Sequence, residues 1–405
     1  MDTSIKVSEY QSRRKKINAR LKDSVGLVFA GAGAPPLRGE WFPDMNFRDL
    51  TGISDEPGAI VMFDPTNPNP KRKMILFLQP VNPEMDVWDG YRDHISQELR
   101  DRYGFETVMR TPALPRFLTE AARRTKKLAC LHPTAAYTQP LTKDLEIFQK
   151  VAARMPGCSI VDMSDEIIKL RLVKSPAEIK QIQNAIKATH NGHKRMLAKL
   201  RPGVGERELH NALVGGFAEA GSIRNAFDPI VGSGHNATVL HYKENIGVCN
   251  DGELVVVDCG AEINGYASDI TRAFPVSGKF TKEQAKLYNI VLKSQQAAIR
   301  AVKPGATMAQ VDEASRKVIR DAGYGDQYLH GVGHHLGLET HDPSPDVKLK
   351  PGMVVTIEPG ISLQDKSIGI RIEDDILVTE KGNRNLSSMI PKTVSEVEAA
   401  IKAAR

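Results

Sequence analysis

The sequence predicts a two-domain protein of the mixed α/β (α+β) class, with a smaller amino-terminal domain over residues 1–168 and a larger domain over residues 169–405. Three observations support this prediction. The chain has 405 residues, more than one compact domain usually holds. Its first part alternates short β-branched runs with helix-like stretches, and its second part contains a helical segment that recurs 102 residues later. Each domain is therefore expected to fold around its own core.

The composition is that of a globular protein, with 41% hydrophobic and 26% charged residues and no apolar run long enough to cross a bilayer. The start of the chain lacks the apolar stretch and small-residue cleavage site of an export signal, so the cytoplasm is the expected location. Four scattered cysteines form no CxxC pair, which favours reduced thiols over disulfides or a zinc site; they are Cys130, Cys158, Cys249 and Cys259.

The net charge of +6 raises the question of nucleic-acid binding, because clustered lysine and arginine residues release counterions from phosphate. The basic residues are spread along the chain, however. The one cluster, at Arg13, Arg14, Lys15 and Lys16, is expected to be the solvated face of a helix. We therefore expect neither a nucleic-acid partner nor a membrane partner.

The amino-terminal domain is predicted to contain a sheet with helices between its strands. Short apolar or β-branched runs indicate strands that begin at Val25, Ala59, Met74 and Ser159. Helix-like stretches occur at 89–102 and 117–125. Because no cluster of catalytic residue types occurs in this part of the chain, the catalytic site is expected in the larger domain.

A long helix is predicted to begin at Ser175. The sequence S-P-A-E supplies an N-cap serine, a proline at the first helical position and Glu178 in the capping-box position. Apolar residues and His193 then recur at three- and four-residue steps, which predicts one buried stripe that ends near 201–203.

Residues 201–221 align without a gap onto residues 303–323, so that each of two segments reads as a Pro-Gly turn, a helix and an Ala-Gly end. Chance recurrence of ordinary loop punctuation would also produce part of this pattern. The length of the match favours an internal repeat of two similar halves, with the site in the crevice between them.

The first half contains two aspartates on a predicted hairpin. Asp258 ends an apolar strand, Asn264-Gly265 is a strong two-residue turn signal, and Asp269 lies on the returning strand. With that turn, Asp258 faces Thr271, and Asp269 is its diagonal neighbour. Two such carboxylates would repel each other and require a shared cation, whereas the simpler alternative places both at solvent-facing strand ends.

The second half contains a dense group of histidines and two further acidic segments. Four of the eleven histidines fall between His330 and His341, which is hard to explain without a metal or oxyanion role. Glu358 ends another apolar strand, and Arg371 and Glu373 share one face of a later strand. Carboxylates with one imidazole form a mostly oxygen shell that suits two divalent ions, first Mn²⁺ and otherwise Co²⁺ or Zn²⁺.

These segments resemble the proline-specific metallopeptidases of the pita-bread fold, the Xaa-Pro aminopeptidases and prolidases. The motifs DITRAFPVSGKF, HGVGHHLGLETHD, TIEPG and GIRIEDD stand in the family order, and weaker similarity extends over most of the chain. The resemblance implies a pita-bread catalytic domain with a two-fold internal repeat. It also implies an amino-terminal domain that serves oligomerisation and the substrate channel, and a homodimer or homotetramer.

For the metal ions, the resemblance implies that Asp258 holds one ion, that Asp269 and Glu373 bridge both, and that His334 and Glu358 hold the other.

For the substrate, the resemblance implies contacts from His241 and His341, with His330 nearby. Arg371 would orient a carboxylate ligand, and Glu358 would transfer a proton. The implied reaction is hydrolysis of an amino-terminal Xaa-Pro bond in a peptide or dipeptide.

One departure from the family pattern concerns the channel, because Ser362 stands where the aminopeptidases usually have tyrosine and the loop at 363–367 is short. Substrate length is therefore left open. The alternative from another class is a non-catalytic pita-bread binding protein, which would typically have lost ligands. Creatinase-like and methionine aminopeptidase activities are ranked below the proline-specific ones. For Trp88, packing within its own chain is favoured over contact with a neighbouring subunit.

Overall fold

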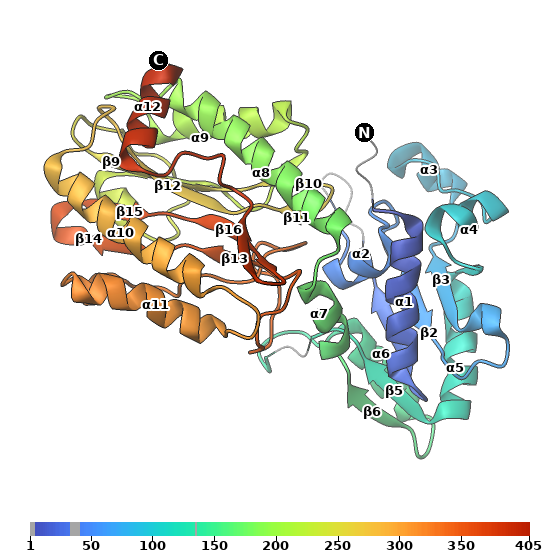
Figure 1. Ribbon diagram of the computed structural model, residues 1–405. Helices are drawn as coiled ribbons and strands as arrows, with labels where there is room; N and C mark the ends of the chain where they lie inside the picture. Colours follow the sequence, from blue (N-terminus) through green and yellow to red (C-terminus); the bar gives the residue numbers. More distant parts are fainter. Residues whose placement is uncertain (1–4, 33–40, 134–135) are drawn as a thin grey trace. The chain divides into compact units, whose positions relative to one another are not determined.

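The computed structural model describes residues 5–32, 41–133 and 136–405, which form two compact units, Ile5–Arg171 and Leu172–Arg405 (Figure 1). Both units mix helices and strands. Within these residues, no helix combines the length and the apolar character that a membrane span requires.

The amino-terminal unit contains a six-stranded mixed sheet in the order β4-β3-β2-β1-β5-β6. The central strand β1 pairs antiparallel with β2 and parallel with β5. The four predicted strands are present as β1, β2, β3 and β6, whereas β4 and β5 were not anticipated. The bounds are β1 Val25–Phe29, β2 Ile60–Phe63, β3 Met74–Leu78, β4 Thr107–Arg110, β5 Lys127–Cys130 and β6 Ser159–Asp162.

Helices cover both faces of this sheet, because alternate residues of its strands face opposite sides. Val28 packs in a core cluster with residues of α1, α2 and α4, and Leu27 packs in a second cluster with residues of α5 and α6. The helices of this unit are α1 Val7–Leu21, α2 Met45–Thr51, α3 Pro83–Asp89, α4 Gln97–Tyr103, α5 Leu114–Thr125, α6 Lys143–Ala152 and α7 Asp165–Leu172.

The basic cluster on α1 is not a solvated face, so that prediction is wrong for two of its four residues. Arg13 and Arg14 are buried, while Lys15 and Lys16 are exposed. Arg14 donates to the backbone oxygens of Leu50 at 2.8 Å and Gly104 at 2.6 Å. These carbonyls lie at the ends of α2 and α4, where helices leave backbone oxygens unsatisfied. A buried guanidinium with several donors therefore joins three helices.

Two further predictions in this unit are wrong. The helix-like stretch at 89–102 is not one helix, because α3 ends at Asp89 and α4 begins only at Gln97, where Ser96 caps it. Trp88, expected to pack within its own chain, is 80% exposed. An indole that is this exposed gains little from burial within the single chain.

The larger unit places strands between two helix pairs, α8 with α9 and α10 with α11 (Figure 1). Its core cluster draws buried side chains from both pairs, from the strands and from α12. The predicted capping box at Ser175 and Glu178 begins α8. The helices of this unit are α8 Pro176–Leu197, α9 Glu206–Glu219, α10 Lys282–Ala301, α11 Met308–Asp321 and α12 Val394–Ala404.

The strands of the larger unit form small sheets in the orders β11-β10-β7, β12-β9-β8, β13-β16-β17 and β14-β15. All the pairings are antiparallel. The bounds are β7 Arg224–Asn225, β8 Ile230–Ser233, β9 Leu254–Cys259, β10 Ala261–Ile263, β11 Tyr266–Ala267, β12 Ile270–Pro275, β13 Val354–Ile357, β14 Gly360–Leu363, β15 Ile368–Arg371, β16 Asp374–Thr379 and β17 Gly382–Asn385.

The internal repeat is visible in the helix bounds. Helices α9 and α11 each have 14 residues, and both ends of α11 lie 102 positions after those of α9. Each packs against the long helix that precedes it. The larger unit therefore consists of two similar halves, as the sequence predicts, and both halves contribute residues to the site.

Candidate metal centre

The first half positions two aspartates on the predicted hairpin. Asn264 and Gly265 form the two-residue loop with φ angles of 52° and 88°, which are the left-handed conformations that such a turn requires. The resulting register pairs Asp258 with Thr271, as predicted. Asp258 thus lies near the end of β9, and Asp269 lies just before β12.

The two strands of the hairpin approach very closely beside Asp269. A Cβ atom at Gly260 would lie 1.8 Å from the backbone oxygen of Ser268. Asp269 follows this point directly, and its backbone N–H donates to a carboxylate oxygen of Asp375 at 3.3 Å. Only glycine fits at position 260 without separating the strands.

The second half contributes Glu373 through a direct link to the first hairpin. Glu373 follows β15 and donates its backbone N–H to the oxygen of Thr271 at 3.1 Å. The hydroxyl of Thr271 in turn donates to Glu373 Oε2 at 2.7 Å and accepts from Arg371 Nε at 3.2 Å. Arg272, fully buried, forms an ion pair with the neighbouring Asp374 at 2.7 Å. The two halves are therefore joined at the strand ends that carry the acidic residues.

His334 is held by the side chain and the backbone of Thr356 in β13. Its N–H donates to Thr356 Oγ1 at 3.0 Å, and its oxygen accepts from the N–H of Thr356 at 2.8 Å. A Cβ atom at Gly333 would lie 2.0 Å from the oxygen of Thr356, so close backbone approach is confirmed at Gly333, whereas a Cβ atom at Gly331 would meet nothing within 4 Å. Glu358 follows β13 and accepts from Thr356 Oγ1 at 3.5 Å.

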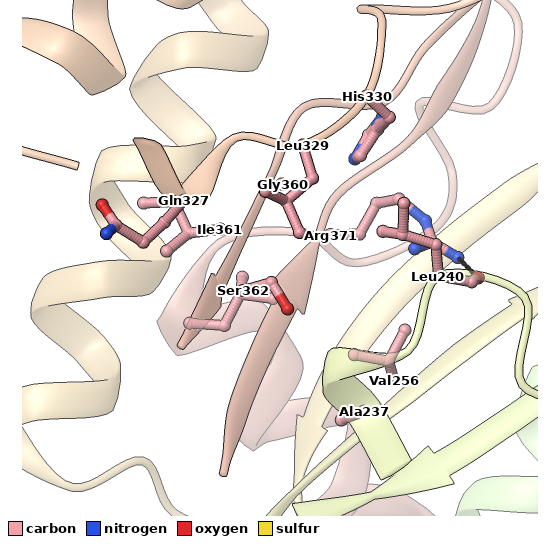
Figure 2. Close-up of a pocket in the computed structure, with 11 residues that line it drawn as sticks. Ala237, Leu240, Val256, Gln327, Leu329, His330, Gly360, Ile361, Ser362 and Arg371 are labelled. Atoms are coloured by element: carbon pink, nitrogen blue, oxygen red, sulfur yellow. Dashed lines mark hydrogen bonds between the residues drawn. The ribbon is translucent and has the colours of Figure 1, made fainter. Parts of the chain in front are cut away.

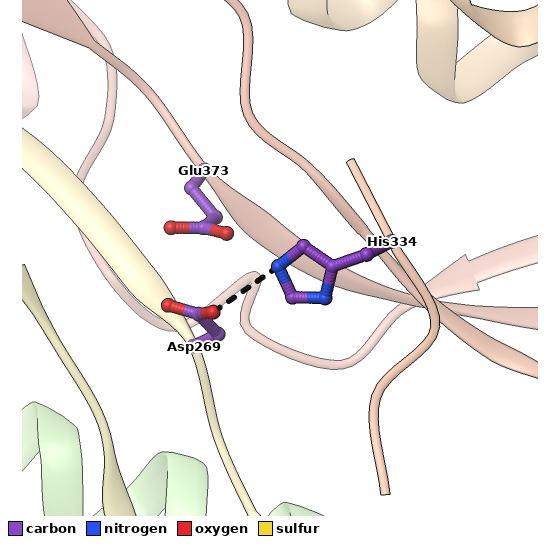
Figure 3. A group of neighbouring side chains, drawn as sticks. All are labelled: Asp269, His334 and Glu373. Carbon is purple, nitrogen blue, oxygen red and sulfur yellow. Dashed lines mark ion pairs between the residues drawn. The ribbon is translucent and has the colours of Figure 1, made fainter. Parts of the chain in front are cut away.

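Side chains from three distant segments meet at one point (Figure 3). One ligand atom each of Asp269, His334 and Glu373 lies within 4.8 Å of the others. His334 Nε2 is 3.5 Å from Asp269 Oδ2 and 3.4 Å from Glu358 Oε1. Asp258 is linked to the cluster by an ion pair with Arg371, in which Arg371 Nη2 lies 2.5 Å from Asp258 Oδ2. The alternative of solvent-facing strand ends is wrong, because Asp258 and Asp269 are both buried.

The electrostatics of this cluster favour a bound cation. Burial, followed by the charges of neighbouring carboxylates, raises the pKa of Asp269 and of Glu373 well above the usual range. Burial also raises the pKa of Glu358. Asp258 Oδ1 is buried and has no hydrogen-bond partner among the described residues. Four carboxylates, one of them with an unpaired oxygen, and one imidazole match the donor set that divalent ions such as Mn²⁺ bind. The residues present therefore fit a metal centre.

Three further histidines surround the cluster. The rings of His334 and His341 have centroids 4.1 Å apart, and His330 Nδ1 lies 3.8 Å from Glu358 Oε2. Burial lowers the pKa of His330 to about 4. Burial, followed by the charges of His334 and His241, lowers the pKa of His341. His330 is therefore neutral near pH 7, and neutral imidazole is favoured at His341, so these rings can donate or accept hydrogen bonds. His241 is exposed on the loop after β8.

A small cavity of about 10 Å³ lies beside Arg371 and His330 (Figure 2). This volume holds about one water molecule, so it does not accommodate a side chain. Ser362 lines it and donates its hydroxyl to the oxygen of Thr238 at 2.8 Å. The other lining residues are Ala237, Leu240, Val256, Gln327, Leu329, Gly360, Ile361 and Ile370.

Sequence reasoning assigns no role to three buried residues beside the site, Thr271, Lys174 and Asp342. Thr271 was placed opposite Asp258 without a role, although the same register brings its hydroxyl to Glu373 and Arg371. Lys174 and Asp342 form a buried ion pair at 2.9 Å, and Asp342 follows His341 directly. A lysine and an aspartate 168 positions apart carry no local signal of such a pair.

Comparison with known proteins gives a consistent picture. The model of Metallopeptidase family M24 matches residues 180–380, and that of the Aminopeptidase P N-terminal domain matches residues 10–129. An Xaa-Pro aminopeptidase of Haemophilus influenzae is 32% identical over 96% of both chains. An Xaa-Pro dipeptidase of Pyrococcus furiosus is 38% identical over 55% of this chain and 65% of its own. The structure of Escherichia coli aminopeptidase P with the inhibitor Pro-Leu superimposes with a TM-score of 0.87, at 30% identity and 99% coverage of both chains.

Proposed function

The chain belongs to metallopeptidase family M24, among the relatives of the Xaa-Pro aminopeptidases, and from this premise we propose that it removes the first residue from substrates with proline at the second position. It is a metallo-exopeptidase of the pita-bread fold, with an aminopeptidase P type amino-terminal domain. The observation that carries the proposal is the convergence of Asp269, His334 and Glu373 from three segments of the chain.

The proposed metal ligands are the five residues of the cluster. Asp258 would hold one ion, His334 and Glu358 the other, and Asp269 and Glu373 would bridge them. The short distances from His334 to Asp269 and Glu358 support this assignment, as does the unpaired oxygen of Asp258. We propose Mn²⁺ as the working ion, with Co²⁺ and Zn²⁺ as alternatives, because the donor set is mostly oxygen.

When bound, a pair of divalent ions acidifies water and polarises a carbonyl group. Hydrolysis forms a bond from the water oxygen to the carbonyl carbon of the first residue and breaks the bond from that carbon to the proline nitrogen. The nitrogen must gain a proton as it leaves. Glu358 is the proposed carrier, because its carboxylate lies within the cluster, with Oε1 3.4 Å from His334 Nε2.

The histidines are proposed to position the substrate. His341 lies against His334, and its lowered pKa favours a neutral imidazole with an N–H to donate to the developing negative charge on the carbonyl oxygen. His241 is proposed to act beside it, and His330 to contact the substrate near Glu358. Arg371 holds Asp258 and is proposed to orient that carboxylate for metal binding.

An Xaa-Pro aminopeptidase cleaves longer peptides, whereas an Xaa-Pro dipeptidase cleaves dipeptides. We propose that the site is compatible with either activity. Relatives of both kinds match the chain. The comparisons lend no support to the non-catalytic alternative, and all five proposed ligands are present.

Assembly and location are part of the proposal. We propose a homodimer or homotetramer, which is supported by the exposure of Val87, Trp88 and Tyr91 at 79%, 80% and 89%. We propose a cytoplasmic location, which is supported by all four cysteines being free.

A length series tests the proposed reaction. Chelator-treated protein is supplied with Mn²⁺, Co²⁺ or Zn²⁺ and assayed with Ala-Pro, Ala-Pro-Ala and Ala-Pro-Ala-Ala. We expect activity to return with Mn²⁺, and cleavage of Ala-Pro alone would identify a dipeptidase. Absence of cleavage with every ion, in protein that binds two metal ions, would rule out the proposed function.

A further inference from the structure

The loop that carries His241 is anchored on both sides of that residue. On one side, the backbone oxygen of Leu240 accepts from Arg371 Nη2 at 3.4 Å. On the other side, the hydroxyl of Tyr242 donates to Glu206 Oε2 at 2.8 Å. Tyr242 is buried, whereas His241 is exposed and interacts electrostatically with His341. The position of His241 therefore depends on what holds its two neighbours.

Glu206 is a fully buried carboxylate whose hydrogen bonds all lead to this loop and its base. Oε1 accepts from the N–H of Ser233 at 2.8 Å and from the amide of Asn236 at 3.0 Å. Oε2 accepts from Tyr242 and from the N–H of Gly247 at 2.6 Å. Burying a carboxylate costs several kcal/mol unless hydrogen bonds replace its hydration. Four donors replace it here, so the interaction fixes the loop from Ser233 to Gly247.

The far side of the loop is packed just as closely. A Cβ atom at Gly247 would lie 2.8 Å from Glu206 Oε1, so a larger residue there would displace the carboxylate from its present position. Asn245 has a φ of 48° and is buried. Its side chain accepts from the N–H of Val231 at 2.7 Å and donates to two backbone oxygens. The loop after His241 is therefore held in one conformation.

The internal repeat shows that a helix in this place can begin with a residue other than a carboxylate. Glu206 is the first residue of α9, and Met308 occupies the matching position of α11, 102 residues later. Helix α11 begins with a capping box formed by Thr307 and Gln310, whereas no side chain caps α9. In the first half, α9 thus begins without a side-chain cap, and the carboxylate of its first residue, Glu206, binds the loop that carries His241.

We propose that Glu206 is a positioning residue that acts through Tyr242 to hold His241 against the substrate carbonyl. The inference rests on the proposed function for the role of His241, but the geometry of the loop stands without it. Glu206 lies at the start of a helix in the scaffold, and scaffold elements position catalytic groups more exactly than loops do.

The test uses Tyr242→Phe, which removes one hydroxyl and keeps the ring. The substrate is whichever member of the Ala-Pro length series the wild type cleaves fastest. We expect kcat/KM for it to fall by about 10- to 100-fold, mostly in kcat, because small displacements of a catalytic group have large effects on rate. Metal content should be unchanged. In a His241→Ala background the same change should have no further effect, since the group that it positions is gone. Glu206→Gln is the second variant and should behave in the same way.

The matched control is Glu253→Gln. Glu253 also accepts from Ser233, through its hydroxyl at 2.9 Å, and from the N–H of Asn250 at 2.9 Å, but it has no described bond to Tyr242 or Gly247. We expect this variant to retain wild-type kcat/KM. An equal loss in the control, or full additivity of Tyr242→Phe with His241→Ala, would overturn the inference.

A second readout does not depend on activity. In protein labelled with ¹³C in its histidine rings, the His241 signal is identified by its loss in His241→Ala. We expect this signal to shift or broaden in Tyr242→Phe and to stay unchanged in Glu253→Gln. An unchanged signal in Tyr242→Phe would refute the positioning role. An inactive wild-type protein with the expected signal changes would instead refute the proposed function and leave the positioning of His241 supported.

Discussion

One of the links between the two halves of the larger unit is the hydroxyl group of Thr271, and Thr271→Val removes it while keeping the shape of the side chain. Thr271 is fully buried, donates to Glu373 at 2.7 Å and accepts from Arg371 at 3.2 Å. Valine can make neither bond. The variant leaves Glu373 without a donor that orients it and Arg371 with one partner fewer.

The expected magnitude follows from the charges on both partners. A hydrogen bond to a charged group contributes about 1.5–3 kcal/mol, and about 1.4 kcal/mol corresponds to a tenfold change in an equilibrium constant. Loss of a group that orients a metal ligand typically lowers metal affinity by about 10- to 100-fold. We therefore expect the dissociation constant for Mn²⁺ to rise by about 10- to 100-fold in Thr271→Val.

The assay is competition for Mn²⁺ against a fluorescent chelator, at fixed pH and ionic strength. Thermal unfolding at a fixed excess of Mn²⁺ provides an independent measure, because ligand binding stabilises the folded state in proportion to the logarithm of its affinity. The matched control is Thr51→Val in the amino-terminal unit. Thr51 is also buried, donates to the oxygen of Phe47 at 2.7 Å and accepts from the N–H of Ile53 at 3.1 Å.

Thr51→Val should lower the free energy of unfolding without changing Mn²⁺ affinity. If Thr271→Val binds Mn²⁺ as tightly as the wild type, the hydroxyl does not orient Glu373, and the reasoning fails. If Thr271→Val and Thr51→Val lose Mn²⁺ affinity equally, the loss comes from lower stability of the whole protein. The hydroxyl of Thr271 then has no specific role in orienting Glu373.

Three further predictions concern catalysis, packing and pH. His341→Ala should lower kcat by about 10- to 1000-fold with two metal ions retained, as measured by turnover and elemental analysis; parallel loss of metal would contradict its role as a substrate contact. Gly260→Ala should abolish high-affinity Mn²⁺ binding because its Cβ would meet Ser268, whereas Gly215→Ala, where a Cβ atom meets nothing within 4 Å, should bind normally in the same titration. Burial lowers the pKa of His193 to about 3, so the unfolded state binds more protons between about pH 6.5 and 3, and the free energy of unfolding falls as the pH falls through that window. His193→Phe should remove a slope of up to about 1.4 kcal/mol per pH unit, measured by urea unfolding of metal-free protein; an unchanged slope would mean that His193 does not titrate on unfolding.

The sequence predicts those parts of the fold whose signals are local. The register of the β9–β12 hairpin follows from the turn at Asn264 and Gly265, because a two-residue loop leaves one pairing for the flanking strands. The matching helices α9 and α11 follow from a repeat that can be read directly. In the same way, the strands of the amino-terminal sheet with strong β-branched runs are predicted, and the weaker runs of β4 and β5 are not.

The contacts that the sequence does not predict are those between residues that are distant in the chain. Arg14 looks like part of a solvated basic cluster, and it is buried because α2 and α4 present their unsatisfied carbonyl oxygens to it. Glu206 looks like an ordinary acidic residue in the first turn of a helix, where the helix dipole favours negative charge. Its four hydrogen bonds depend on a loop up to 41 positions away, whose path no local pattern predicts.

The duplicated scaffold explains why the metal centre is both symmetric in layout and asymmetric in chemistry. Each half contributes acidic residues from strand ends: Asp258 and Asp269 from the first, Glu358 and Glu373 from the second. Cross-links between the halves, from Thr271 to Glu373 and from Arg371 to Asp258, hold these carboxylates together against their mutual repulsion. A cation bound among them would relieve the same repulsion, so metal binding and the association of the halves reinforce each other. The imidazoles break the symmetry, because three of the four in and around the site lie in the second half and only His241 lies in the first. That single histidine is exposed on a loop, and in our proposal the buried Glu206 of the same half holds it in place.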